Sequence, residues 1–449
     1  MKILDKIKKN SSTKYYNLKQ LLKKANWKVC LSMLYPGIGQ IFYKRYVKGF
    51  IYFIVSSLLI SYFIIRGAGD IFGFFTLGLI EGNAWYGVEG DNSIVILIMG
   101  ILAIIALVFY LLIYISNIKD AYKLQLLEEK NKPLPTFKDE LGVLLDKSFY
   151  KTALLLPVVG VLVFSVLPII FMILIAFTNY GGDIIPPKLV DWVGLDNFEK
   201  ILTLGQFAPT FFKIFLWNII WAVLSTALNY FAGLGLALLL NKKCVKGKAI
   251  WRSFPVLAYA IPGFITLLAF KFMFSYGGPI NYYITKAGFG AVGFLGLDAT
   301  MSARIIGLLV NSWISVPSIM LMATGILANI NTELYEAANI DGANSFKIFM
   351  KITLPYMLFA TTPVLISQFI GNFNNFGIFY FLRGGLYSDG YFLASDTDLL
   401  INWLYNMSID NNYYSIGAAI SLIIFVITSV ISLTVYVFSP SYKQEGTFR

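Results

Sequence analysis

The chain has 449 residues, of which 57% are hydrophobic and only 13% are charged. A globular domain of this size cannot hide so much apolar surface from water, whereas a bilayer accepts apolar helices of roughly 20 residues. The composition therefore excludes a soluble protein and predicts an all-α integral membrane protein. The formal charge of +12 then indicates orientation in the membrane, not binding to nucleic acid.

The basic residues near the start of the chain predict which side of the membrane it faces. Residues 1–28 form a basic segment with nine lysines and one aspartate, and residues 241–252 carry five positive charges and no acid. Lysine and arginine in short flanking segments favour the cytoplasmic side. No small-residue cleavage motif precedes the first apolar run, so we expect no cleaved signal peptide. Both termini of this multi-pass membrane protein are predicted to be cytoplasmic.

Long apolar runs predict about eight transmembrane helices, because each is long enough to cross the hydrocarbon core of a bilayer. The runs are at 48–66, 94–117, 153–177, 214–240, 252–274, 303–327, 358–381 and 414–438. Two other stretches, 29–42 and 71–80, are too short or too rich in glycine to span. We expect them to be interfacial or re-entrant.

A polar segment at 118–150, which contains the sequence EEKNKPLPTFKDE, divides the runs into two groups. We predict a cytoplasmic linker there, because prolines and charges interrupt the apolar pattern. Before it lies an N-terminal hydrophobic region, 29–117, with the interfacial hairpin and two transmembrane helices. After it, residues 151–449 form a transmembrane domain with six helices.

Little in the chain suits catalysis or metal binding. The sequence has no histidine, which removes the usual general base and a common metal ligand. Cys30 and Cys244 lie beside lysines without a metal-ligand spacing, so we expect reduced thiols. Asp396 and Asp398 fall in a predicted outer loop without an identified partner. A membrane-embedded enzyme is therefore disfavoured, and no metal site is predicted.

The apolar runs instead carry two stripes of neutral polar residues. One stripe consists of Asn311, Ser315 and Ser318, and the other of Gln368, Asn372 and Asn375. Spacings near i, i+4 and i+7 place each set on one helical face, so the two stripes can face each other across a cavity. Amides among aromatic side chains suit an uncharged, hydroxyl-rich ligand such as a sugar. The alternative is that these residues are hydrogen-bonding contacts between helices.

A charged, alanine-rich segment, ELYEAANIDGANSFKIFMKITLP at 333–355, separates two apolar runs. It resembles the EAA motif of importer-type ABC permeases, where such a segment forms a cytoplasmic helix that contacts the ATPase subunit. The resemblance implies coupling roles for Glu336, Ala337, Ala338, Asp341, Gly342, Ala343 and Pro355. Small residues allow close approach, and Pro355 is expected to begin the next membrane helix. The alternative is an amphipathic surface helix between spans.

Most of residues 150–449 resembles the MalF-type permeases of maltose and maltodextrin importers. Matching stretches include FTNY at 177–180, GLDNF at 194–198, GKAIWR at 247–252, AYAIP at 258–262, NFNNF at 372–376 and TDLL at 397–400. The resemblance implies a type I ABC importer permease fold with a MetI-like core. The substrate positions that it implies are Asn311, Ile314, Ser315, Ser318, Gln368, Gly371, Asn372 and Asn375.

The chain departs from the enterobacterial members of that family at three of these positions. Ser318 stands where they have tyrosine, Gly371 where they have phenylalanine, and Gln368 where they have serine. The loss of two rings widens the site and weakens sugar stacking, which leaves oligosaccharides other than maltose open. The outer loop at 178–211 is also short, whereas the enterobacterial relatives carry a large inserted domain there.

The resemblance also implies partners. No G-x-x-x-x-G-K-[ST] sequence occurs, so ATP and magnesium are expected on a separate ATPase and no cofactor on this chain. The expected assembly contains a second, MalG-like permease, two ATPase subunits and an extracellular solute-binding (lipo)protein. It carries an oligosaccharide substrate and lies in the lipid of a bacterial cell membrane. Alternatives are a permease for another neutral oligosaccharide, such as one derived from galactans or other glycans, or a secondary sugar transporter. No inverted repeat or coupling-ion site favours the last of these.

Overall fold

The computed structural model describes residues 24–146, 148–242 and 244–438. The secondary-structure elements of these residues are all helices. Seven helices in this part of the chain are long and apolar enough to cross a membrane. They are Tyr46–Thr76, Ser93–Glu129, Thr152–Ile175, Ala208–Asn241, Thr300–Leu327, Ser345–Arg383 and Tyr414–Phe438. An eighth span forms if the bent pair Lys248–Ala260 and Gly263–Met273 crosses together. The predicted all-α membrane fold with about eight spans is confirmed.

The bent pair shows where the sequence pattern was misleading. The apolar run at 252–274 predicts one helix, but α13 (Lys248–Ala260) and α14 (Gly263–Met273) meet at 92°. Ile261 has an extended backbone, as is usual for the residue before a proline, and Pro262 precedes α14. The first residues of α14, Gly263 and Phe264, lie beside the cavity described below.

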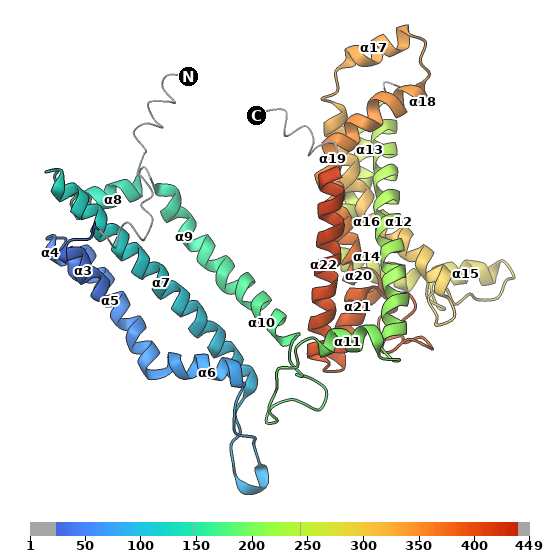
Figure 1. Cartoon of the computed structure of the whole chain (residues 1–449). Coiled ribbons are helices and arrows are strands. Elements are labelled where there is room, and N and C mark those ends of the chain that lie inside the picture. The colour runs from blue at the N-terminus through green and yellow to red at the C-terminus, as the bar shows by residue number, and fades with distance from the viewer. Residues whose placement is uncertain (1–23, 147, 243, 439–449) are drawn as a thin grey trace. The chain divides into compact units, whose positions relative to one another are not determined.

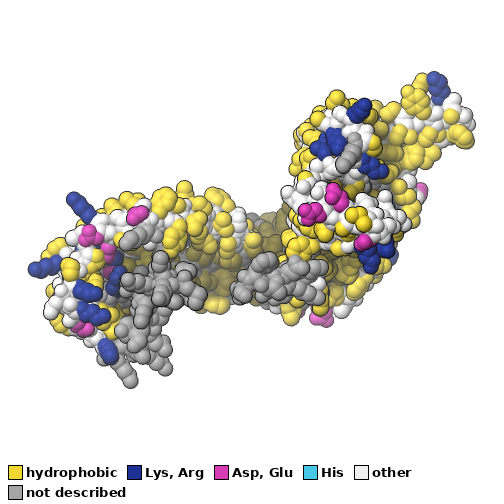
Figure 2. Space-filling model, turned by 90° about the horizontal axis from the view of Figure 1, so that it is seen from above, with side chains coloured by type: hydrophobic (Ala, Val, Ile, Leu, Met, Phe, Trp, Pro, Cys, Tyr) yellow, Lys and Arg dark blue, Asp and Glu magenta, His cyan; other side chains and the backbone are white. Residues whose placement is uncertain are grey.

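The described chain forms two compact units. The first comprises the residues up to Met172 together with Ile184–Asp191, and the second comprises Ile173–Asp183 and the chain from Trp192 onward. Figure 1 shows α3 to α9 in the first unit and α11 to α22 in the second. Figure 2 shows apolar side chains over the flanks of both units, as expected for surfaces that face lipid. The predicted division at 118–150 stays a prediction.

In the first unit, residues predicted to be interfacial form a short helical hairpin, α3 (Trp27–Leu34) and α4 (Ile38–Phe42). A buried polar network joins it to α7 (Ser93–Glu129): Asn117 donates to the carbonyl of Ser32 at 2.9 Å and accepts from the N–H of Gly37 at 3.0 Å. Gln40, fully buried, donates to the carbonyl of Asn117 at 3.0 Å. The hairpin is therefore anchored on α7 by hydrogen bonds as well as by apolar contact.

The rest of the first unit is also largely helical. The helix α5 (Tyr46–Tyr62) continues through a π-helical turn at Phe63–Gly67 into α6 (Ala68–Thr76), and the interfacial or re-entrant placement of 71–80 stays a prediction. Much of the predicted linker at 118–150 is helical, since α7 extends to Glu129 and α8 spans Phe137–Leu145. The chain then continues through α9 (Phe149–Val161), the π-helical turn Leu162–Val166 and α10 (Leu167–Ile175).

The second unit is built around α12 (Ala208–Asn241) and α16 (Thr300–Leu327). The two helices approach closely at Gly233, where a Cβ atom would lie 2.7 Å from the side chain of Ile319. A core cluster that includes Trp217, Trp221 and Phe379 joins them to α14 and α20 (Phe376–Arg383). These contacts hold several polar residues of different helices around one cavity.

The remaining helices of the second unit surround this core. They are α11 (Asp196–Thr203), α15 (Pro279–Lys286), α17 (Thr332–Ile340), α18 (Ser345–Ile348), α19 (Leu354–Phe373), α21 (Leu400–Tyr405) and α22 (Tyr414–Phe438). Figure 1 shows α17 standing off one end of the bundle. Residues 1–23 of the predicted cytoplasmic segment 1–28, and the predicted cytoplasmic tail at the C-terminus, lie outside the described residues.

Candidate functional site: an amide-lined cavity and a projecting helix

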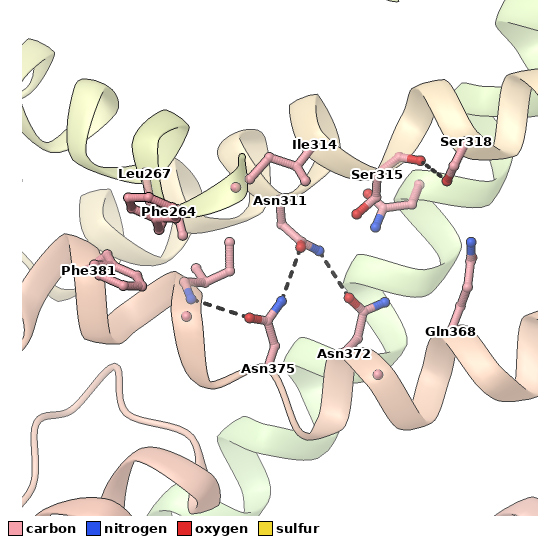
Figure 3. Close-up of a pocket in the computed structure, with 15 residues that line it drawn as sticks. Phe264, Leu267, Asn311, Ile314, Ser315, Ser318, Gln368, Asn372, Asn375 and Phe381 are labelled. Atoms are coloured by element: carbon pink, nitrogen blue, oxygen red, sulfur yellow. Dashed lines mark hydrogen bonds between the residues drawn. The ribbon is translucent and has the colours of Figure 1, made fainter. Parts of the chain in front are cut away.

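Three asparagines form a hydrogen-bonded row, here called the amide row, inside the second unit (Figure 3). Asn311 of α16 donates to Oδ1 of Asn372 at 3.2 Å, and Asn375 donates to Oδ1 of Asn311 at 3.3 Å. Asn372 in turn donates to Oγ1 of Thr226 on α12 at 3.0 Å. Asn311 and Asn372 are buried, with 3% and 7% of their surface exposed. Each amide can still accept or donate further, because it has two N–H groups and two lone pairs.

The row exists because the helix predicted at 358–381 breaks at Asn374, between α19 and α20. Asn374 ends α19, and the side chain of Asn375 caps α20 by accepting from the N–H of Ile378 at 3.3 Å. Carbonyls at the break accept hydrogen bonds from α12: Trp221 donates to the carbonyl of Asn372 at 3.1 Å. Asn218 donates to that of Phe373 at 3.0 Å. Interior backbone irregularity is tolerated in a membrane protein only when its polar groups are satisfied in this way.

The amide row borders a cavity of about 440 Å³. All eight residues predicted as substrate positions line it: Asn311, Ile314, Ser315, Ser318, Gln368, Gly371, Asn372 and Asn375. The two predicted stripes therefore do meet across one cavity. At Gly371 a Cβ atom would have no neighbour within 4 Å, so the cavity is open on that side.

Sequence reasoning missed seven other lining residues: Asn229, Gly263, Phe264, Leu267, Gly377, Ile378 and Phe381. The lining residues of α14 could not be predicted, because every face of a continuous apolar run is apolar and the pattern does not indicate which face lies toward the cavity. The pair Ile261-Pro262 was the available signal, since a proline in a run of this length favours a break. Asn229 accepts from Ser312 at 2.8 Å, which ties α12 to α16 beside the cavity.

The chemistry of the cavity is neutral. None of the fifteen lining residues is charged. Ser318 donates to the carbonyl of Ser315 at 2.8 Å, and Oε1 of Gln368 is buried without a hydrogen-bond partner in the described chain. An unpaired buried acceptor is costly, so Gln368 is suited to a ligand that brings a hydroxyl group. The lining can bind a polyhydroxylated neutral molecule but offers no countercharge for an ion.

The segment predicted to couple to an ATPase is exposed and locally well ordered. Asn331 caps α17, and α17 ends in a Schellman motif in which Ala343 donates to the carbonyl of Ala338 at 2.9 Å. Gly342 donates to the carbonyl of Asn339 at 3.1 Å and has φ of +73°. This left-handed backbone conformation favours glycine, which explains why the motif has glycine at position 342.

The other coupling positions lie around this turn. Glu336, Ala337, Asp341 and Gly342 are exposed, and Ala338 and Ala343 are partly buried. Two apolar side chains of the same segment also face outward: Ile340 is 86% exposed and Phe346 is 71% exposed. Exposed apolar groups on a charged segment are typical of an interaction surface.

Pro355 lies in the first turn of α19 (Leu354–Phe373), as the prediction placed it, but helical backbone also precedes that turn. The helix starts at Ser345 and continues through a π-helical turn, Phe349–Thr353, into α19. Leu354 alone separates Pro355 from that turn. A proline inside a helix removes one hydrogen bond, and the change in helical pitch before it fits this loss. The coupling segment is thus joined to the amide row by one helix with a local irregularity.

An ionic cluster closes the other end of α20. The predicted absence of partners for Asp396 and Asp398 is wrong. Arg383 donates to Oδ1 of Asp396 at 2.6 Å and to Oγ1 of Thr397 at 3.0 Å. Asn406 donates to Oδ2 of Asp398 at 3.2 Å. Arg304 donates to the backbone carbonyl of Asp396 at 2.6 Å, with its guanidinium 4.0 Å from the ring centroid of Trp217. Thr300 also donates to Asp396.

The two aspartates of the cluster have opposite pKa shifts. Burial alone would raise the pKa of Asp396, but hydrogen bonds from Thr300 and Arg383 outweigh it and lower the pKa. Burial raises the pKa of Asp398 to about 7, and the hydrogen bond from the Ser395 N–H opposes this only in part. Asp398 is therefore poised to titrate near neutral pH.

Comparison with known proteins places these features in context. Residues 230–444 match the family described as binding-protein-dependent transport system inner membrane component. The galactooligosaccharides transport system permease protein GanP of Bacillus subtilis is 34% identical over 425 residues, covering 93% of this chain and 98% of GanP. The maltodextrin transport system permease protein MalC of Streptococcus pneumoniae is 36% identical over 430 residues, covering 93% of this chain and 97% of MalC.

A solved structure is similar in fold. The crystal structure of a bacterial alginate ABC transporter, in complex with an alginate pentasaccharide-bound periplasmic protein, contains a chain that superposes with a TM-score of 0.52. The match is 23% identical and covers 66% of this chain and 96% of that one. It supports the arrangement of helices, not the choice of ligand.

Proposed function

Because the chain belongs to the family of binding-protein-dependent transport system inner membrane components, we propose that it forms half of the translocation pathway of an ATP-driven importer for a neutral oligosaccharide. The observation that carries this proposal is the uncharged cavity around the amide row. A sugar that leaves water must replace its hydrogen bonds, and the amides supply donors and acceptors at positions held by the surrounding helices.

The substrate proposed first is a maltodextrin-like sugar. MalC, a maltodextrin transport permease protein, is similar to this chain over nearly its whole length. A galactooligosaccharide is the second candidate, because GanP is similar over a comparable length. Both candidates are neutral and rich in hydroxyl groups, as the lining of the cavity requires. The eight predicted substrate positions are assigned to sugar contact on the same grounds.

The coupling role is assigned to the segment at 333–355. Exposed Ile340 and Phe346 and the charge of Glu336 support contact with a separate ATPase subunit, which binds ATP and magnesium. Closure of two ATPase subunits on ATP pushes this segment and moves α16 and α19. That motion opens the cavity to the outside. The inward-open and outward-open conformations differ in their contacts with the ATPase subunits, and ATP therefore shifts the population between them.

The remaining partners follow from the family. We propose that the chain acts beside a second, homologous permease, and that an extracellular solute-binding (lipo)protein delivers the sugar. We place both termini and the coupling segment in the cytoplasm. The lysine-rich turn between α12 and α13 supports this orientation, because it lies at the same end of the second unit as α17 (Figure 1).

Uptake into proteoliposomes tests the function. The complete transporter, with its binding protein outside and ATP inside, is supplied in turn with labelled maltotriose, β-galactotriose and a charged uronic-acid trisaccharide. We expect ATP-dependent uptake of at least one neutral sugar and none of the charged one. Uptake of the charged sugar alone, or of no oligosaccharide by a complex with active ATPase, would contradict the proposal.

A further inference from the structure

One end of the cavity has a lining that the amide row does not explain. Phe264 and Leu267 from α14 and Phe381 from α20 lie on one side of the amides, whereas Ser318 and Gln368 lie on the other side (Figure 3). The rings of Phe264 and Phe381 have centroids 6.4 Å apart and planes tilted by 38°. The cavity is therefore aromatic at one end, amide-lined in the middle, and hydroxyl- and carboxamide-lined at the other end.

The side chain of Phe381 is held in place by packing against neighbouring apolar and aromatic side chains. It packs against the buried core cluster that contains Trp217, Trp221 and Phe379, and the neighbouring ring of Tyr380 meets it edge-on with centroids 5.3 Å apart. A ring fixed by such packing offers a preformed apolar surface, because little conformational entropy remains to be lost on binding.

The space beside Phe381 is kept free by a glycine. Gly377 also lines the cavity, and a Cβ atom there would lie 3.8 Å from the ring of Phe381 and 3.6 Å from Leu267. Phe264 follows the 92° break between α13 and α14, which is what brings α14 to the cavity. The aromatic end therefore depends on two helix breaks, one before α14 and one before α20.

Resting on the proposed function, we propose that Phe264, Leu267 and Phe381 form an aromatic subsite that determines specificity. One sugar ring stacks its C–H face on Phe381, while the hydroxyl groups of the adjoining ring bind the amide row. A pyranose suits this arrangement because its ring face is apolar and its edge carries hydroxyl groups. The preferred ligand is thus a neutral oligosaccharide of at least two rings.

The same geometry excludes other sugars. A single ring cannot occupy the aromatic end and the middle of the cavity together, so monosaccharides lose one set of contacts. A uronic-acid oligomer would bring a carboxylate into a cavity whose fifteen lining residues include no cation. Burying an unpaired charge costs far more than the stacking contributes.

The test compares ring removal at Phe381 with matched variants in the complete transporter. Phe381→Leu keeps apolar bulk but removes the ring, Phe381→Tyr keeps the ring, and Phe425→Leu makes the same change on α22, outside the cavity. Uptake of labelled maltotriose or β-galactotriose, whichever the parent imports, is measured in proteoliposomes. We expect roughly threefold to tenfold slower uptake for Phe381→Leu. Phe381→Tyr and Phe425→Leu should stay near the parent.

Other outcomes separate the subsite from the function on which it rests. If Phe381→Leu imports the sugar like the parent while Asn375→Ala is impaired, the aromatic subsite is wrong and the proposed function stands. If the parent complex imports neither sugar, the proposed function fails. Should Phe381→Leu not assemble, Phe264→Leu replaces it with the same readout, and parent-like uptake by that variant also overturns the subsite.

Discussion

Asn372 and Asn375 are the residues whose replacement tests the cavity most directly. Alanine at either position removes hydrogen bonds to Asn311 or Thr226 and takes a partner from any bound hydroxyl group. A buried polar group left unpaired costs about 1–3 kcal/mol, so transport of the sugar should fall by roughly fivefold or more. The measurement is uptake by mutant complexes that assemble at normal levels. Parent-like uptake of every tested sugar would mean that these amides only join helices.

Asp398 gives the permease a predicted dependence on pH. Its pKa is raised to about 7 in the folded chain, above the ordinary value of 3.8. The folded state therefore binds this proton more tightly than the unfolded state, and the resulting stability is fully present below about pH 4 and is lost as pH rises through 7. The pKa of Asp396 is lowered from its ordinary value of 3.8, so the titration of Asp396 changes the stability only at pH values below those compared here.

We therefore expect the wild-type protein to unfold at a lower temperature at pH 8 than at pH 5.5. Asp398→Asn should reduce this difference, because asparagine can still accept from the Ser395 N–H but does not ionise. Thermal unfolding followed by tryptophan fluorescence is suited to the measurement, since Trp217 donates to Thr397 beside the cluster. An unchanged pH dependence in Asp398→Asn would show that another group is responsible.

At the scale of elements, the turn after α17 carries the coupling prediction. Valine at Gly342 is strained at φ of +73°, although no atom lies within 4 Å to obstruct its side chain. Glu336→Lys reverses an exposed charge on the same segment. Both variants should insert and assemble but hydrolyse ATP without matching uptake, because the surface offered to the ATPase is altered. The readout is the ratio of sugar imported to phosphate released.

Gly182→Val is the matched control for this experiment. Gly182 also has a positive φ, +58°, with nothing within 4 Å of an added Cβ atom, but it lies in the segment between α10 and α11. Equal backbone strain away from the coupling segment should leave the ratio unchanged. A normal ratio in both Gly342→Val and Glu336→Lys would remove the coupling role from this turn.

At the scale of the whole molecule, the two native cysteines report orientation. Both are free and exposed, and Cys244 lies in the turn between α12 and α13 that we place in the cytoplasm. In a Cys30→Ser background, a membrane-impermeant maleimide should label Cys244 only after the cells are permeabilised. Trp85→Cys, in the predicted outer loop where Trp85 is 96% exposed, should be labelled in intact cells. Labelling of Cys244 in intact cells would reverse the topology.

By itself, the sequence determined the class of protein, about eight spans, the family and the residues of the two polar stripes. Composition and span length suffice for the first two, because the bilayer imposes one length on every crossing helix. The motif at 333–355 and the run at 372–376 keep their spacing without any knowledge of the fold, and the family resemblance they predicted is confirmed. The stripes could be found because helical periodicity is local.

Tertiary structure alone decided how those stripes are completed. The breaks before α14 and α20 bring Phe264 and Phe381 to the cavity, and Asn372, Asn375 and Asn311 become one hydrogen-bonded row. The ion pair between Arg383 and Asp396 depends equally on how the loop after α20 folds back. Such contacts join residues of separate helices, and an apolar run does not reveal which neighbour each helix face meets. A broken helix persists only because its freed backbone groups find partners elsewhere in the bundle.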